Sequence, residues 1–161
     1  SGGGPPLPVR APRAGDFDQW DLVNAAYCIE MHLPVQGSRD ERQAAFASQA
    51  ECGHWWGYFD SGDLLATTSL NAVYARIGQL GGVYTRPAYR GRGLARVTME
   101  KVMQDAWLRH RLERLILFTG EDNRAARALY ASLGFDTRGY FGLLFGTPRE
   151  CRNPPRRTSC V

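Results

Sequence analysis

Residues 81–95 constrain this chain most, because they read as a short apolar strand, a glycine-rich basic turn and the start of a helix. Gly91 and Gly93 let the backbone bend and approach a ligand without a Cβ in the way. The first turn of the following helix presents N–H groups that have no intrahelical partner, at the positive end of the helix dipole. Arg90 and Arg92 add formal charge beside these donors. The segment therefore predicts an anion site, and its expected ligand carries phosphates.

Two common phosphate-binding motifs do not fit this turn. A Walker loop ends in Gly-Lys-Ser/Thr, whereas Lys101, the only lysine of the chain, falls several residues inside the expected helix. The dinucleotide fingerprint needs a third glycine where Arg96 stands. On this segment alone, a strand-to-helix connection with incidental arginines is the alternative.

The residues before the turn predict helices followed by antiparallel strands. One helix is expected over 16–31 from its apolar spacing. A second helix starts at Ser38, which forms a capping box with Glu41, and ends by Gly53. Strands are expected over 54–60, 64–73 and 76–85, the first two joined as a hairpin.

The residues after the turn predict a parallel crossover. A helix over 94–109 and a buried strand over 112–119 imply a right-handed strand-helix-strand unit. Asp122 or Asn123 caps a further helix that ends at Gly134, and a strand is expected over 135–145. The apolar face of this last helix consists of Ala126, Leu129, Tyr130 and Leu133.

Length and composition favour a single domain of 161 residues in a reduced, cytoplasmic setting. The expected divisions are a flexible lead-in over 1–8, one domain over 9–146 and an Arg/Pro-rich tail over 147–161. No apolar run approaches the ~20 residues of a membrane span. The four cysteines form no Cys-x-x-Cys pair, so no metal is expected. A net charge of +4 is modest and disfavours nucleic acid as a partner.

Two spaced motifs carry a resemblance to a known family. Residues 90–95, preceded by 83–85, resemble the acetyl-CoA pyrophosphate motif of the GNAT superfamily of N-acetyltransferases. Residues 123–135 are similar to the family's second motif. Within the superfamily, 81–85 and 118–123 look most like its bacterial FR47-like branch. The resemblance implies an α/β (α+β) fold: a mixed central sheet with an antiparallel N-terminal half and a parallel, splayed strand pair, flanked by about four helices.

The resemblance implies acetyl-CoA as the acyl donor and direct acetyl transfer to a primary amine of a small molecule or a protein. A backbone N–H of the strand at 83–85 would stabilise the oxyanion. Tyr130 occupies the position of the family's general acid, although its helical spacing also fits plain packing. The residues implied for cofactor binding are Val83, Tyr84, Thr85, Arg90, Gly91, Arg92, Gly93, Leu94, Ala95, Asn123 and Tyr130.

The general base is not evident. Many members of the family carry a carboxylate on the strand before the turn, and 76–85 has none. The base is then water or a group from the segments that wall the acceptor site in this family. A plain surface role is the more frequent one for any such group. The candidates are Glu30, His32, Glu51 and His54. Trp20, Trp55, Trp56 and Tyr58 either line an acceptor pocket or pack in the core.

Two other functions stay open on the sequence. One is a non-catalytic acyl-CoA-binding sensor or regulatory module, which the missing base favours. The other, weaker, is acetylation of charged tRNA or a ribosomal protein, motivated by the arginine-rich tail and a pI near 9.1. The acceptor, the length of the acyl chain and a homodimeric state cannot be read from these residues.

Overall fold

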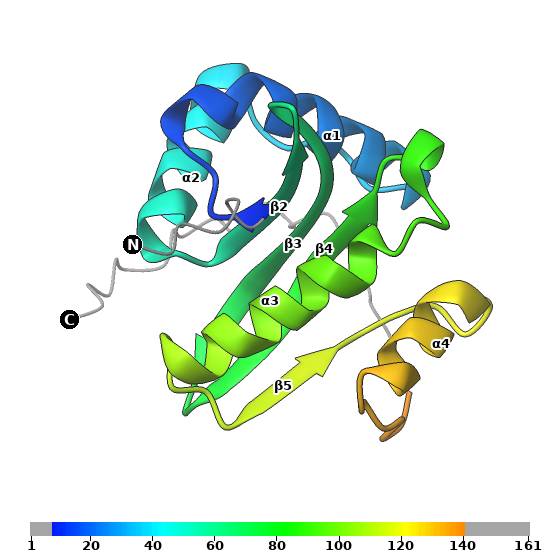
Figure 1. Cartoon of the computed structure of the whole chain (residues 1–161). Coiled ribbons are helices and arrows are strands. Elements are labelled where there is room, and N and C mark those ends of the chain that lie inside the picture. The colour runs from blue at the N-terminus through cyan, green and yellow to red at the C-terminus, as the bar shows by residue number, and fades with distance from the viewer. Residues whose placement is uncertain (1–7, 141–161) are drawn as a thin grey trace, which may run out of the picture.

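The protein, seen in a computed structural model that describes residues 8–140, is built on a mixed sheet of five strands. The strands lie in the order β1-β2-β3-β4-β5 (Figure 1). Neighbours are antiparallel from β1 to β4, and β4 and β5 are parallel. The strands are β1 (Val9–Arg10), β2 (Trp55–Asp60), β3 (Asp63–Tyr74), β4 (Ile77–Thr85) and β5 (Arg114–Leu117). The α/β architecture expected from the sequence is confirmed.

Four α-helices flank this sheet within the described residues (Figure 1). They are α1 (Phe17–Glu30), α2 (Arg39–Cys52), α3 (Leu94–Leu108) and α4 (Arg124–Ser132), with short 3-10 turns at η1 (Ala14–Asp16) and η2 (Pro87–Tyr89). The expected helix starts and stops agree with these bounds to within about two residues. Ser38 and Glu41 form the predicted capping box of α2, and Gly53 ends that helix in the left-handed region.

Helix α3 covers one face of the sheet and forms the larger core. Met99, Val102 and Ala106 are fully buried and pack with Leu70 and Leu80. A second, smaller cluster of Val23, Leu64 and Tyr84 joins α1 to the opposite face. The two clusters are separate, so the sheet carries apolar side chains on both faces over its middle strands.

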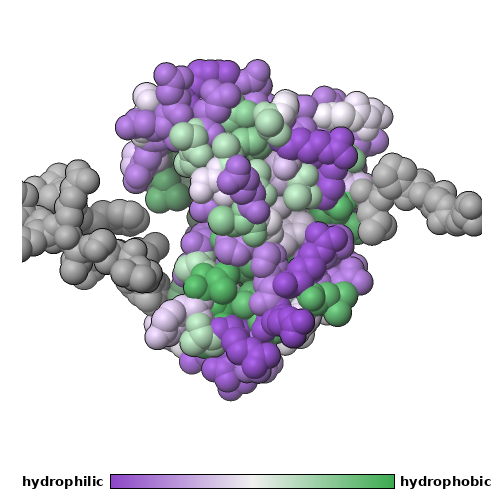
Figure 2. Space-filling model, turned by 90° about the vertical axis from the view of Figure 1, so that its left-hand side faces the viewer, coloured by the Kyte–Doolittle hydropathy of each residue, from purple (hydrophilic) through white to green (hydrophobic). Residues whose placement is uncertain are grey.

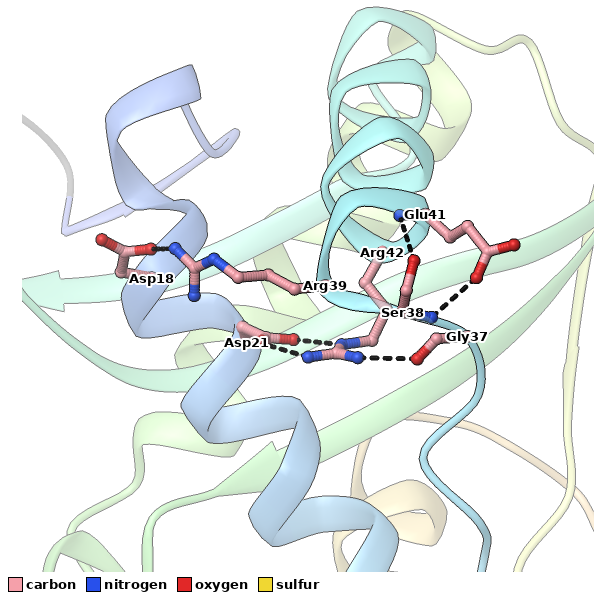
Figure 3. A network of polar contacts seen from close by, with 7 residues as sticks. All are labelled: Asp18, Asp21, Gly37, Ser38, Arg39, Glu41 and Arg42. Carbon is pink, nitrogen blue, oxygen red and sulfur yellow. Dashed lines mark hydrogen bonds and ion pairs between the residues drawn. The ribbon is translucent and has the colours of Figure 1, made fainter.

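Two ion pairs connect α1 to α2 (Figure 3). Arg42 donates two hydrogen bonds to the Asp21 carboxylate at 2.7 and 2.9 Å, and a third at 2.8 Å to the carbonyl of Gly37. Arg39 pairs with Asp18 in an exposed setting. These contacts fix the connection between the two helices, which contains His32.

Two expectations for strands need correction. The strand expected over 112–119 is shorter, and it is not buried on both faces: Leu115 and Leu117 pack on the core, while Ile116 and Phe118 are 39% and 49% exposed. The reason is that β5 is the edge strand of the described sheet, and only its face with Leu115 and Leu117 packs on the core. Residues 135–140 form no strand, and the remainder of the expected strand over 135–145 lies outside the described residues.

The surface is mainly polar on the side seen in Figure 2, where hydrophobic residues form small, separate patches. Within residues 8–140, no helix has the length and apolar character that a membrane span requires. The tail over 147–161, nearly all of the lead-in over 1–8, and Cys151 and Cys160 lie outside the described residues.

Candidate active site

The glycine turn has the backbone of an anion-binding helix N-terminus. Gly91 and Gly93 adopt φ values of +75° and +78°, a region that L side chains rarely occupy. Gly93 is the N-cap residue of α3, and its carbonyl accepts the first helical hydrogen bond from the N–H of Val97 at 3.2 Å. The N–H groups of Leu94, Ala95 and the residue after them therefore have no intrahelical partner. Apart from the neighbouring residues of the chain, no atom lies within 4 Å of where a Cβ would stand on either glycine, so the space beside the backbone is open at both.

The two arginines of the turn differ in their surroundings. Arg90 donates from Nε to the carbonyl of Thr85 at 2.9 Å and from its guanidinium to Glu30 at 2.6 Å. The hydrogen bond that Arg90 donates to the Glu30 carboxylate raises the pKa of Arg90. Arg92 lies over the ring of Tyr89 at 5.2 Å and makes no ion pair within residues 8–140. Arg90 thus ties the end of α1 to the turn, and Arg92 keeps its charge available.

Strands β4 and β5 part beside the turn. Their parallel pairing runs from Ile77 opposite Arg114 to Leu80 opposite Leu117 and ends there, although β4 continues to Thr85. Figure 1 shows the chain after β5 leading to α4 rather than following β4. The last five residues of β4 therefore pair with β3 on one side only.

A bulge interrupts β4 where the strands part. Thr67 pairs with Tyr84 and Ser69 with Gly81, so one residue of β3 faces two of β4. Gly82 has a φ of +57°. The Thr67 hydroxyl donates to the carbonyl of Gly82 at 2.9 Å, and the Ser69 hydroxyl to that of Gly81 at 3.0 Å. These two hydroxyls were not foreseen from the sequence; the paired glycines inside a strand are the signal that predicts a bulge.

Tyr130 lies beside the parted strands. It is 8% exposed and belongs to the core cluster that contains Leu80 and Met99. Its ring makes an edge contact with Phe135, with ring centres 6.2 Å apart. Burial raises the pKa of Tyr130, and Tyr27 adds to the increase, so the hydroxyl is protonated at neutral pH. Within the described residues no group hydrogen-bonds this hydroxyl.

Asn123, rather than Asp122, caps α4. Its side-chain oxygen accepts from the N–H of Ala126 at 3.2 Å, which satisfies one free donor of the helix. Gly134, at φ +92°, follows the helix as predicted. The cap fixes the start of the helix that carries Tyr130.

Among the candidate bases, only two lie near the turn. Glu30 is the last residue of α1 and reaches Arg90 across the turn. His32 follows that helix, exposed and with a φ of +54°. Glu30 is thus engaged in an ion pair, while His32 faces solvent.

Glu51 and His54 lie elsewhere. The His54 ring is 5.0 Å from that of His110, which follows the C-terminus of α3. Helix α3 has 15 residues and so extends ~22 Å from the glycine turn to this end. Burial lowers the pKa of His54, and the nearby His110 lowers it further. Glu51 is exposed on the last turn of α2, three residues earlier.

The tryptophans pack rather than line an open pocket. Trp20 and Trp55 pack in a tilted arrangement with ring centres 4.5 Å apart, and Trp56 donates from Nε1 to buried Asp105 at 2.8 Å. Tyr58 packs against the larger core. In the part of the chain that the structure describes, no three potential metal ligands lie together.

The fold and the turn define a class of protein, the acetyl-CoA-dependent acyltransferases. A family model described as "Acetyltransferase (GNAT) family" matches residues 20–135, which include the glycine turn, the parted strands and Tyr130. The chain belongs to this family, and it is an acetyltransferase that uses acetyl-CoA as acyl donor. No curated protein sequence matches the chain.

Solved structures share the fold at low sequence identity. A putative acetyltransferase from Agrobacterium tumefaciens has a TM-score of 0.67 and 22% identity, over 86% of this chain and 99% of that one. A predicted acetyltransferase with acetyl-CoA from Clostridium acetobutylicum has a TM-score of 0.64 and 16% identity, over 84% and 94%. A ribosomal-protein-alanine N-acetyltransferase from Brucella melitensis has a TM-score of 0.69 and 19% identity, over 81% and 85%.

Proposed function

We propose that this protein moves the acetyl group of acetyl-CoA directly to a primary amine. The observation that carries the proposal is the parting of β4 and β5 after Leu80 and Leu117, between the glycine turn and the buried Tyr130. A thioester in this gap would lie against backbone on one side and a protonated hydroxyl on the other. No covalent enzyme intermediate or metal is needed for this reaction.

The turn would hold the pyrophosphate of CoA. Its donors would be the backbone N–H groups at 91–95, and the space where a Cβ would stand on Gly91 and Gly93 is open. Arg92 would add charge, and Arg90 would keep the turn in place through Glu30 and Thr85. Residues 83–85 would pair with the pantetheine as an added strand, and Asn123 would contact the pantetheine or the acetyl end.

The chemistry is acyl transfer. A neutral amine attacks the thioester carbon, so that a C–N bond forms and the C–S bond breaks. Backbone N–H groups of β4 near Val83 would stabilise the oxyanion, and Tyr130 would donate its proton to the departing sulfur. The amine proton goes to water or to a base, for which His32 is the best-placed of the four candidates because Glu30 is paired with Arg90.

Two measurements test the proposal. Calorimetric titration of the whole chain with acetyl-CoA should show binding, and thiol release should rise when an accepted amine is added. Absence of binding contradicts the proposal. Binding without thiol release for any amine of a broad panel would instead support a non-catalytic acyl-CoA sensor. The panel should include peptides with a free N-terminal amine, since a structural neighbour is a ribosomal-protein-alanine N-acetyltransferase. Placement in the FR47-like branch is likewise a proposal, which rests on residues 81–85 and 118–123.

A further inference from the structure

The bulge of β4 turns two successive carbonyls toward β3. In a regular strand, successive carbonyls point to opposite sides. Here the carbonyls of Gly81 and Gly82 both accept hydrogen bonds from side chains of β3, Ser69 and Thr67. The left-handed φ of Gly82, +57°, permits this departure from alternation.

The direction of the carbonyls fixes the direction of the following N–H groups. In a trans peptide unit, the C=O of one residue and the N–H of the next point in opposite directions, and no cis peptide bond occurs in the described chain. The N–H groups of Gly82 and Val83 therefore both point away from β3. That side of β4 is the side of β5, where strand pairing has ended at Leu80 and Leu117. Two donors converge on the gap in which we place the thioester.

We propose that Thr67 and Ser69 are positioning residues, which aim the Gly82 and Val83 N–H groups at the carbonyl oxygen of the bound thioester. This inference rests on the proposed function. Neither side chain touches the substrate; each acts through the carbonyl that it holds. If either hydroxyl is removed, the peptide unit whose carbonyl it holds can rotate toward the alternation of a regular strand. The N–H of that peptide unit then turns out of the gap.

Thr67 is the stronger of the two constraints. Its hydroxyl has one acceptor, the carbonyl of Gly82 at 2.9 Å. The Ser69 hydroxyl is shared between the carbonyl of Gly81 at 3.0 Å and Oδ1 of Asn71 at 2.8 Å. Thr67 also governs the peptide that ends in the Val83 N–H, the donor farther along the unpaired part of β4.

The chain offers a matched set of variants. Thr67→Val keeps the β-branched shape and removes the hydroxyl, and Thr67→Ser restores it. Thr68→Val is the control, because Thr68 is the neighbouring buried threonine and its hydroxyl donates within β3, to the carbonyl of Thr67 at 2.8 Å. A fold defect would appear in all valine variants, whereas a positioning defect is specific to Thr67.

The readout is the infrared stretch of acetyl-CoA labelled with carbon-13 at its thioester carbonyl. Bound to the wild-type protein, the stretch should fall below that of free acetyl-CoA, because two N–H donors polarise the carbonyl. In Thr67→Val it should move back toward the free value, while the Kd for acetyl-CoA changes by no more than about threefold. Turnover of an accepted amine should drop about tenfold or more. Thr68→Val and Thr67→Ser should resemble wild type in all three measurements.

The outcomes separate this inference from the proposed function. If wild-type protein does not bind acetyl-CoA, the proposed function itself is contradicted. If wild type binds, but the Thr67→Val/Ser69→Ala double variant shows the wild-type carbonyl frequency, only the positioning role is overturned. Should Thr67→Val fail to fold, Ser69→Ala replaces it, with a shift expected in the same direction.

Discussion

At the scale of single residues, Tyr130 owes its protonation to burial rather than to a bonded partner. Because its pKa is raised above the ordinary value near 10, it should stay protonated across the working range of pH. We expect Tyr130→Phe to lower kcat by ~10²-fold, the scale of a lost general acid, with little change in the Kd for acetyl-CoA. The pH profile of the wild type should show no alkaline fall from this group below pH ~10.

Tyr58→Phe is the matched control, since Tyr58 packs half-buried against the same core cluster from β2. It should keep wild-type turnover. Equal kcat values for Tyr130→Phe and wild type, measured by thiol release with an accepted amine, would leave Tyr130 with a packing role alone.

For Glu30, a role in an ion pair and a role as general base predict different effects of substitution on kcat. Its carboxylate is 2.6 Å from the Arg90 guanidinium, and each side chain is 45% exposed. We expect Glu30→Gln to keep kcat within about threefold and to alter the Kd for acetyl-CoA by a similarly small factor, because an exposed pair contributes little. A loss of kcat of ~10²-fold, with the loss of the acidic limb of the pH profile, would instead identify Glu30 as the base.

Glu113→Gln controls for a general charge effect. Glu113 forms an ion pair of similar exposure with Arg76, at 2.7 Å, where β4 and β5 begin. Its replacement should change neither the Kd nor kcat, both measured on the full chain by titration and thiol release.

At the scale of elements, α1 and α2 depend on one partly buried ion pair. The hydrogen bond from Arg42 lowers the pKa of Asp21. A carboxyl with a lowered folded pKa stabilises the fold above its unfolded pKa, near 3.9, and loses this contribution as pH falls through the folded pKa. Asp21→Asn should therefore reduce the free energy of unfolding by about 1 kcal/mol at pH 7, and by less at pH 3.

Asp18→Asn provides the comparison, because its pair with Arg39 is much more exposed, 76% and 59% against 15% and 21% for Asp21 and Arg42. Urea unfolding at the two pH values should show the loss for Asp21→Asn and almost none for Asp18→Asn. A pH-independent loss for Asp21→Asn would mean that packing, not the ion pair, is responsible.

The helices and their ends can be predicted from local sequence. Which faces of the strands are buried is predicted less well. The capping box at Ser38, the glycine after α4 and the apolar face of α3 depend on contacts within a few residues, so their spacing predicts them. The exposed face of Ile116 depends instead on the place of β5 at the edge of the sheet. A run of apolar residues does not carry that information.

The candidate site shows the same division. The φ values of Gly91 and Gly93 were expected from the turn itself. The partnerships of Arg90 with Glu30, and of Thr67 with Gly82, join residues 60 and 15 positions apart. Neither has a periodic signal in the sequence, so only the folded chain reveals them.

At the scale of the whole molecule, β4 connects the two apolar clusters. Leu80 belongs to the cluster under α3, whereas Tyr84 belongs to the cluster under α1. In a regular strand, two residues four positions apart share a face, and the bulge at Gly81 and Gly82 shifts this register by one. The bulge lies where the pairing of β4 with β5 has ended, and it lets one strand contribute to both apolar clusters, so the candidate site and the core share this segment.

Because acetyl-CoA would bind only the folded chain, we expect it to stabilise the fold. A ligand present at 100 times its Kd adds about 2.7 kcal/mol to the free energy of unfolding, which corresponds to a rise in Tm of about 5–10 °C for a chain of this size. S-acetylpantetheine, which has the thioester but no pyrophosphate, should raise Tm far less at the same concentration, because it leaves the N–H groups at 91–95 unoccupied. Thermal unfolding followed by circular dichroism compares the two ligands directly. An equal rise with both would mean that the glycine turn contributes nothing to binding, and that the gap between β4 and β5 carries the affinity alone.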